Sequence, residues 1–136
     1  MLLKAGYLSV TRSASTIAPR LNCTGFFMFH GSIVALVTPM DRHGNIDLDA
    51  YRRLVDLHLL AGTNSIVVAG TTGESACLSE TEFGQLLKLA VERVNSKMTV
   101  IAGTGGPDTA RTIARTNLAA GLGADGALVV TPYYNR

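Results

Sequence analysis

The sequence predicts an α/β fold built on a parallel sheet. Four short apolar runs begin near residues 32, 65, 99 and 126, and a spacing of about thirty residues is typical of a βαβ unit. The runs are continuous rather than alternating with polar residues, which indicates strands that are covered on both faces. A stretch with helical patterning follows each of the first three runs. Together these observations predict about four parallel strands and three helices.

Local signals place the boundaries of these elements. The expected strands are 32–37, 65–69, 99–102 and 126–130. The first helix should begin after Asp47, a good N-cap residue, and end near Ala61, with Gly62 at the position that favours left-handed backbone. The second should begin after Ser79, because Glu82 lies three residues later and completes a capping box.

Apolar residues repeat every three or four positions along the last two helices. In the second helix the stripe consists of Phe83, Leu86, Leu87, Ala90 and Val94. The third helix should begin after Asp108 and end within 121–123, with one side formed by Ala110, Ile113, Ala114, Asn117 and Leu118. Such stripes predict the faces that pack against the sheet.

Two architectures combine helices with a buried parallel sheet, namely the doubly wound open sheet and the (β/α)8 barrel. A barrel needs eight strands and eight helices in about 250 residues. The 136 residues of this chain would therefore form nearly half of a barrel.

Charge divides the chain into a leader and a body. Residues 1–28 contain Lys4, Arg12 and Arg20 and no acidic residue, whereas 29–136 are close to neutral. We treat 29–136 as the folded domain. The leader has three interpretations: a start codon set too far upstream, an organellar transit peptide, or a structured extension. The protein is expected to be cytoplasmic, or organellar if the leader is a transit peptide.

Composition argues against several classes of function. A nearly neutral body gives no electrostatic basis for binding nucleic acid, and no apolar run reaches the length of a membrane span. Cys23 and Cys77 form no metal or redox motif, and no pair of histidines has metal-ligand spacing. We therefore expect no metal and no cofactor. Cys77 is expected to be a small buried residue.

The turn after the second strand is the strongest candidate for a functional site. Residues 70–75 read Gly-Thr-Thr-Gly-Glu-Ser, and this turn offers the hydroxyls of Thr71 and Thr72 and several free backbone N–H groups to a carboxylate or phosphate. It lacks the lysine of a P-loop and the glycine spacing of a dinucleotide site. A tight turn without a ligand is the alternative. Glu74 is expected to be a buried capping or orienting carboxylate.

Two further strand ends carry recognisable residues. The glycine-rich segment 103–106 is a short turn on its own evidence. In 131–135, Tyr133 and Tyr134 are adjacent and cannot both point inward. One of them could face a central site and the other a partner, or both could form a half-buried aromatic rim.

Four segments together resemble the dihydrodipicolinate synthase family of pyruvate-dependent class I aldolases. They are 31–39 (GSIVALVTP), 70–75 (GTTGES), 100–105 (VIAGTG) and 129–136 (VVTPYYNR). The resemblance covers about 28–136. The doubled threonine and the Thr-Pro-Tyr-Tyr-Asn run are more similar to the synthases than to the N-acetylneuraminate lyases of the same superfamily.

The resemblance implies the N-terminal half of a (β/α)8 barrel with its active site at the strand C-termini. It also implies the reaction: pyruvate forms a Schiff base with a barrel lysine, and the enamine attacks aspartate semialdehyde on the pathway to diaminopimelate and lysine. The implied partners are these two small molecules and further copies of the chain in a homodimer or homotetramer.

The resemblance also assigns roles to residues. Thr71 matches a threonine that joins two tyrosines in a proton relay, and Thr72 matches one that binds the pyruvate carboxylate. Tyr134 matches the relay tyrosine contributed across the dimer interface. Ser75, Ala76 and Tyr133 match a regulatory lysine pocket at that interface.

Some family features are missing from this sequence. The lysines are Lys4, Lys88 and Lys97, and none is expected at a strand C-terminus, where a Schiff-base lysine would lie. The chain alone is therefore predicted to be inactive. In the regulatory pocket, Pro107 replaces an asparagine and Arg111 a glutamate of lysine-sensitive members, which predicts weak or absent inhibition by lysine.

Two alternatives to the synthase remain. Another pyruvate-dependent keto-acid aldolase would use the same barrel. A non-catalytic half-barrel acting as a binding or assembly module would belong to a different class of protein.

Overall fold

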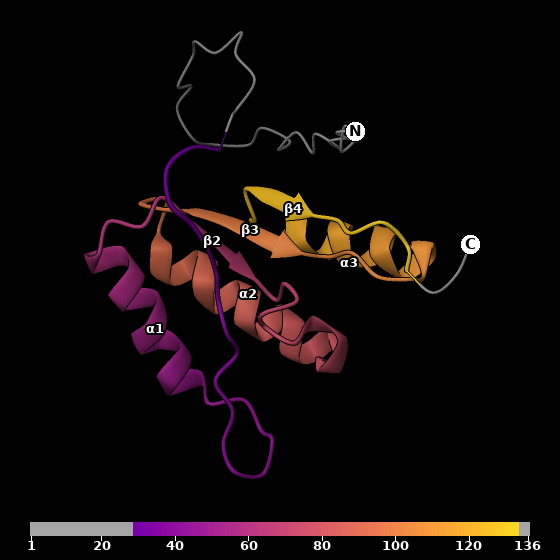
Figure 1. Ribbon diagram of the computed structural model, residues 1–136, viewed down its shortest axis with the longest axis horizontal. Coiled ribbons are helices and arrows are strands. Elements are labelled where there is room, and N and C mark those ends of the chain that lie inside the picture. The colour runs from indigo at the N-terminus through magenta and orange to yellow at the C-terminus, as the bar shows by residue number, and fades with distance from the viewer. Residues whose placement is uncertain (1–28, 134–136) are drawn as a thin grey trace, which may run out of the picture.

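The computed structural model describes residues 29–133, and its centre is a sheet of four parallel strands (Figure 1). The strands are β1 (Ile33–Ala35), β2 (Ser65–Val68), β3 (Thr99–Gly103) and β4 (Gly126–Leu128), and they lie side by side in that order. Every neighbouring pair is parallel. The predicted number, direction and approximate positions of the strands are confirmed.

Three α-helices connect the strands in the predicted order. They are α1 (Leu48–Leu60), α2 (Glu80–Val94) and α3 (Thr109–Gly121), and a short 3-10 helix, η1 (Ser75–Cys77), precedes α2. Each α-helix joins two neighbouring strands, so the described chain consists of three successive βαβ units. None of its helices is long and apolar enough to cross a membrane.

The predicted helix caps are all present. The Asp47 carboxylate accepts a hydrogen bond from the backbone N–H of Ala50 at 2.8 Å, and Asp108 caps α3 in the same way. Ser79 and Glu82 form the reciprocal capping box at the start of α2. Gly62 follows α1 with a φ of +71°. These caps satisfy backbone groups that a helix end leaves unpaired.

The helices cover one face of the sheet. Along β2 and β3, alternate residues belong to the main hydrophobic cluster: Ile66, Val68, Val100 and Ala102. The predicted stripe of α2 (Phe83, Leu86, Leu87, Ala90 and Val94) packs against them and is fully buried. Because successive strand residues point to opposite faces, this alternation identifies the face that the helices cover.

The prediction that both faces of every strand are buried is confirmed for β2 and β3 and wrong for β1 and β4. All residues of β2 are buried, but β1 and β4 are largely exposed. The apolar residues that are about half exposed near these edges are Ile33, Val37, Leu128, Val129 and Val130. The reason is position: β1 and β4 are the edges of the described sheet and each pairs with one strand only.

The predicted packing side of α3 is also wrong. Ile113 is 57% exposed and Leu118 is 39% exposed, whereas Arg115, Thr116 and Ala119 are buried. The physical reason is that α3 docks through polar groups. The Arg115 guanidinium lies 4.5 Å from the centre of the Phe83 ring. With this arginine on the inward side of α3, Ile113 and Leu118 lie on the outward side.

Glu80 completes this polar contact between α2 and α3. Its carboxylate accepts a hydrogen bond from Arg111 at 2.9 Å and another from Arg115 at 3.2 Å. Partial burial of Glu80 opposes ionisation, but the hydrogen bonds and charges of the two arginines outweigh it and lower the pKa of this carboxyl group. One carboxylate thus holds two guanidinium groups, one of them buried.

Gly103, at the end of β3, lies against the backbone that directly follows β2. A Cβ atom at this position would be 2.2 Å from the carbonyl oxygen of Ala69 and 2.8 Å from the nitrogen of Gly70. Both atoms are backbone and cannot rotate away. We therefore predict that Gly103→Ala lowers the free energy of unfolding by about 1–3 kcal/mol, as overpacking does in other cores. Chemical denaturation would measure the loss.

Gly121→Ala is the matched control for this substitution. Gly121 ends α3, and a Cβ there would have no atom within 4 Å. Because alanine is favoured over glycine in helices, the control should raise stability by a few tenths of a kcal/mol, up to about 1 kcal/mol. Equal effects of the two substitutions would contradict the steric explanation.

Tyr51 of α1 is the largest buried side chain, and its hydroxyl has no hydrogen-bond partner among the described residues. Burial raises the pKa of this phenol well above its usual range. An unpaired buried hydroxyl costs about 1–3 kcal/mol. We therefore predict that Tyr51→Phe leaves the melting temperature unchanged or raises it, whereas Tyr51→Ala lowers stability by about 3–5 kcal/mol. A clear loss in Tyr51→Phe would show that the hydroxyl is paired.

Candidate functional site

The candidate site lies along the edge where the strands end. Because the sheet is parallel, the segments that follow the strands gather at this edge; in Figure 1 the arrowheads of β2, β3 and β4 point toward it. These segments are Thr38–Pro39 after β1, 69–75 after β2, 104–107 after β3 and 129–133 after β4.

The turn after β2 closes on itself through its backbone. Ala69 is buried and has a φ of +52°, a conformation that costs energy for any residue with a side chain. The Gly70 carbonyl accepts hydrogen bonds from the N–H groups of Gly73 at 3.0 Å and Ser75 at 3.3 Å, and the N–H of Glu74 donates to the Thr71 carbonyl at 3.0 Å. The prediction of free N–H groups is therefore wrong for these three, whereas the N–H groups of Thr71 and Thr72 make no hydrogen bond with the described residues.

Thr71 and Thr72 are exposed at the tip of this turn. Their hydroxyls make no hydrogen bond with any residue that the structure describes. Each can both donate and accept a hydrogen bond. The turn therefore presents two adjacent hydroxyls to a ligand, held on a backbone that is fixed beneath them.

The turn is anchored to the end of β1. The buried hydroxyl of Thr38 donates a hydrogen bond of 2.8 Å to the carbonyl oxygen of Gly73. A Cβ on Gly73 would lie 2.9 Å from the carbonyl oxygen of Leu36. The Gly73 backbone thus lies directly against β1, at a distance that a larger residue could not adopt.

Two predictions about neighbouring side chains are wrong. Glu74 is exposed, and it stands before η1 with a φ of +56° and makes no side-chain capping bond. Cys77 is a free thiol and is exposed. Both residues belong to the segment around η1, whose single short turn directs them outward instead of into the core that begins at Leu78.

The predicted regulatory residues do gather in one place. A cavity of about 190 Å³ is lined by Ser75, Ala76 and Tyr133, together with Pro107 and Arg111. Thr71 and Thr72 are not among its lining residues. Tyr134 lies outside the described residues, so its predicted place in the relay has no structural counterpart here.

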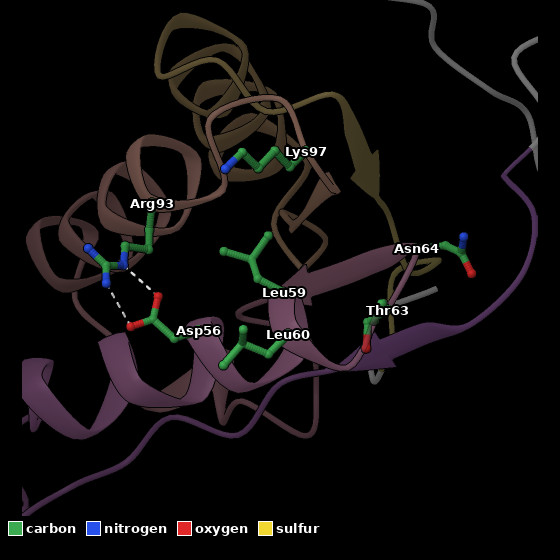
Figure 2. Close-up of a pocket in the computed structure, with 8 residues that line it drawn as sticks. Asp56, Leu59, Leu60, Thr63, Asn64, Arg93 and Lys97 are labelled. Atoms are coloured by element: carbon green, nitrogen blue, oxygen red, sulfur yellow. Dashed lines mark hydrogen bonds and ion pairs between the residues drawn. The ribbon is translucent and has the colours of Figure 1, made fainter.

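A larger cavity, of about 630 Å³, lies at the opposite end of the sheet (Figure 2). It is bordered by Asn64 before β2 and Lys97 before β3, and by an ion pair in which Arg93 donates to Asp56 at 2.5 and 2.8 Å. The hydrogen bonds from Arg93 lower the pKa of Asp56. This cavity is at the edge where the strands begin, away from the threonine turn.

Neither of the two described lysines follows the C-terminus of a strand. Lys88 is exposed on α2, 3.9 Å from Glu92. Lys97 is exposed and lies between α2 and the start of β3. Within residues 29–133 no group of three His, Cys, Asp or Glu side chains could hold a metal ion.

Several residues that build the site were missed in the sequence. Thr38 and Thr104 each follow a strand and are buried, and the Thr104 hydroxyl is 2.8 Å from that of Thr116. Arg115 lines the smaller cavity, and Glu80 accepts a hydrogen bond from this arginine at 3.2 Å. For Thr38 and Thr104, the sequence shows a threonine after an apolar strand, but nothing in the sequence identifies the group to which its hydroxyl is hydrogen-bonded.

Comparisons with known proteins agree on the relationship. The family model described as the dihydrodipicolinate synthetase family matches residues 28–136. A 4-hydroxy-tetrahydrodipicolinate synthase of Stutzerimonas stutzeri is 51% identical over 109 residues, which are 80% of this chain and 37% of that protein. The corresponding synthase of Pseudomonas aeruginosa is 50% identical over the same share of both chains.

Solved structures give the same result. The chloride-inhibited dihydrodipicolinate synthase of Acinetobacter baumannii, complexed with pyruvate, superposes with a TM-score of 0.79 at 48% identity, covering 80% of this chain and 38% of that one. The enzyme of Cyanidioschyzon merolae with lysine bound gives 0.74 at 40% identity, covering 79% and 37%. This chain spans just over a third of the length of these relatives.

The matched segment, the four parallel strands and the three helices all correspond to the N-terminal part of the barrel of these enzymes. The chain therefore belongs to the dihydrodipicolinate synthetase family.

Proposed function

We propose that this chain provides the pyruvate-binding part of a 4-hydroxy-tetrahydrodipicolinate synthase, which condenses pyruvate with L-aspartate 4-semialdehyde. The observation that carries the proposal is the pair of exposed hydroxyls, Thr71 and Thr72, on a fixed turn at the C-terminal edge of the sheet. That edge is where barrel enzymes place their catalytic groups.

The two threonines would have different roles. The Thr72 hydroxyl would donate a hydrogen bond to the pyruvate carboxylate and hold it at the turn. The Thr71 hydroxyl would pass protons between tyrosines, one of them Tyr134. Forming a Schiff base requires protons to move on and off the carbinolamine, and a chain of hydroxyls can move them.

The nucleophilic amine would come from outside this segment. A Schiff-base lysine must reach the bound keto acid, and Lys88 and Lys97 lie on a helix and at the opposite edge of the sheet. We propose that the 136 residues alone are inactive. The complete enzyme would be a cytoplasmic homodimer or homotetramer in which Tyr134 crosses the interface. One related structure, 44% identical in sequence, is that of a monomeric variant.

A second candidate is another pyruvate-dependent keto-acid aldolase on the same barrel. The basis for it is that the roles proposed for Thr71 and Thr72 concern pyruvate and not the aldehyde. The choice of aldehyde would then depend on residues outside this segment, and the two candidates separate in substrate assays of a completed barrel.

A chimera tests the proposed function directly. Residues 29–136 would replace the matching segment of the Stutzerimonas stutzeri synthase, which is 51% identical. We expect the chimera to condense pyruvate with aspartate semialdehyde and to form a pyruvate adduct on borohydride reduction, visible by mass spectrometry. The 136-residue chain alone should form no adduct. An adduct on Lys88 or Lys97 would refute the assignment.

Threonine-to-valine variants of the chimera separate the roles within the same test. Thr71→Val should lower kcat by about 10²-fold or more, the usual effect of losing a proton-transfer group. Thr72→Val should mainly raise the KM for pyruvate, by about tenfold, for one hydrogen bond to a charged group. Thr99→Val, at the start of β3, is the matched control and should change neither.

Insensitivity to lysine is a second expected property of this chimera. In the cavity lined by Ser75, Ala76 and Tyr133, the Arg111 guanidinium is held 2.9 Å from Glu80 and leaves a cation where an ammonium ligand would need an anion. Pro107 offers no side-chain amide. We predict that millimolar lysine barely changes the rate. The Cyanidioschyzon merolae enzyme, solved with lysine bound, is the positive control; comparable inhibition of both would overturn the prediction.

A further inference from the structure

Thr38 has a buried hydroxyl that none of the roles above uses. The residue follows β1, is 7% exposed, and donates through Oγ1 to the carbonyl oxygen of Gly73 at 2.8 Å. The two residues are 35 positions apart in the sequence, so this bond is a tertiary contact between the end of β1 and the turn after β2.

The carbonyl that Thr38 holds belongs to the peptide group between Gly73 and Glu74. Because a peptide group is planar, fixing its oxygen also fixes its N–H. That N–H, on Glu74, donates to the carbonyl oxygen of Thr71 at 3.0 Å. A chain of two hydrogen bonds through one rigid plane therefore leads from Thr38 to the backbone of Thr71.

Backbone contacts also hold the part of the turn that precedes this peptide group. The N–H of Gly73 donates to Gly70 at 3.0 Å. The Gly73 backbone also lies close to the segment that follows β1, because a Cβ on Gly73 would be 2.9 Å from the Leu36 carbonyl oxygen and 3.3 Å from the Thr38 hydroxyl oxygen. Thr72 is covalently joined to Gly73, and the Thr71 carbonyl is hydrogen-bonded to the N–H of Glu74. The backbones of both exposed threonines are therefore connected to the peptide group that Thr38 binds.

We propose that Thr38 is a positioning residue of the pyruvate site, which fixes the backbone beneath Thr71 and Thr72 through the Gly73–Glu74 peptide. The inference rests on the proposed function, because it assumes that the Thr72 hydroxyl binds the keto acid and that the Thr71 hydroxyl relays protons in the same site. A tight site for a small carboxylate needs its donors held in place before the ligand arrives. The Thr38 hydroxyl supplies that restraint without touching the ligand.

The test uses three variants of the 136-residue chain. Thr38→Val keeps the shape of the side chain but removes the donor, and Thr38→Ser keeps the donor. Thr116→Val is the matched control, because it removes another buried hydroxyl. That hydroxyl is 2.8 Å from the hydroxyl of Thr104 and donates to the carbonyl of Thr112 at 2.8 Å, and it makes no hydrogen bond with the turn after β2. All three are compared with the parent by amide NMR.

Hydrogen exchange of the Glu74 amide is the first readout, expressed relative to amides in the middle of α2 so that a change in global stability cancels. We expect about tenfold faster relative exchange in Thr38→Val, the usual effect of losing one hydrogen bond to a buried group. Thr38→Ser and Thr116→Val should stay close to the parent. Unchanged exchange in Thr38→Val would overturn the inference.

Pyruvate titration is the second readout. The amides of Thr71 and Thr72 should shift with pyruvate in the parent and in Thr38→Ser, and the dissociation constant should rise about tenfold in Thr38→Val. Equal pyruvate affinity in the parent and Thr38→Val would also overturn the inference. A parent that shows no shift would count against the proposed function, while the exchange readout would still decide the role of Thr38.

One measurement on the parent chain covers the case in which Thr38→Val does not fold. A hydroxyl proton that donates to a buried carbonyl exchanges slowly with water, so the Thr38 hydroxyl should be visible and show a cross-peak to Gly73. A hydroxyl proton that exchanges as fast as those of the exposed threonines would overturn the inference.

Discussion

The close approach of three backbone segments at the C-terminal edge of the sheet is the constraint on which the candidate site depends. The turn after β2 lies between the end of β1 and the end of β3. A side chain on Gly73 would meet the Leu36 carbonyl, and one on Gly103 would meet the Ala69 carbonyl. Glycine is required at both positions because there is no space for a Cβ atom, and not because the backbone has a positive φ. Only this close packing brings the Thr38 hydroxyl within reach of the turn.

This packing also accounts for the strained backbone at Ala69. A residue with a positive φ persists where its surroundings hold it there. Ala69 is buried, and its carbonyl lies against Gly103 while the next residue accepts two hydrogen bonds from the turn. The abrupt change of direction at Ala69 ends β2 and presents Thr71 and Thr72 at the surface. The strained residue therefore comes just before the turn that carries the two threonines of the proposed pyruvate site.

Much of the fold could be predicted from the sequence because its signals are local. The caps at Asp47, Ser79 and Asp108 and the stripe of α2 involve residues within a few positions of each other, and all are confirmed. The side of α3 that packs inward could not be predicted in this way. Arg115 is buried because Glu80, Phe83 and the Leu78 carbonyl receive it, and a periodicity of apolar residues carries no information about such partners.

The same distinction applies to the site. Thr71 and Thr72 were found because their turn is a contiguous motif, whereas Thr38 acts through a residue 35 positions away. The outward positions of Glu74 and Cys77 depend on how η1 joins the turn to α2, which no pattern of residue types specifies. A short motif can thus identify the groups that face a ligand. The residues that hold those groups still belong to neighbouring strands, and their contribution becomes visible only when the backbone of the sheet edge is known.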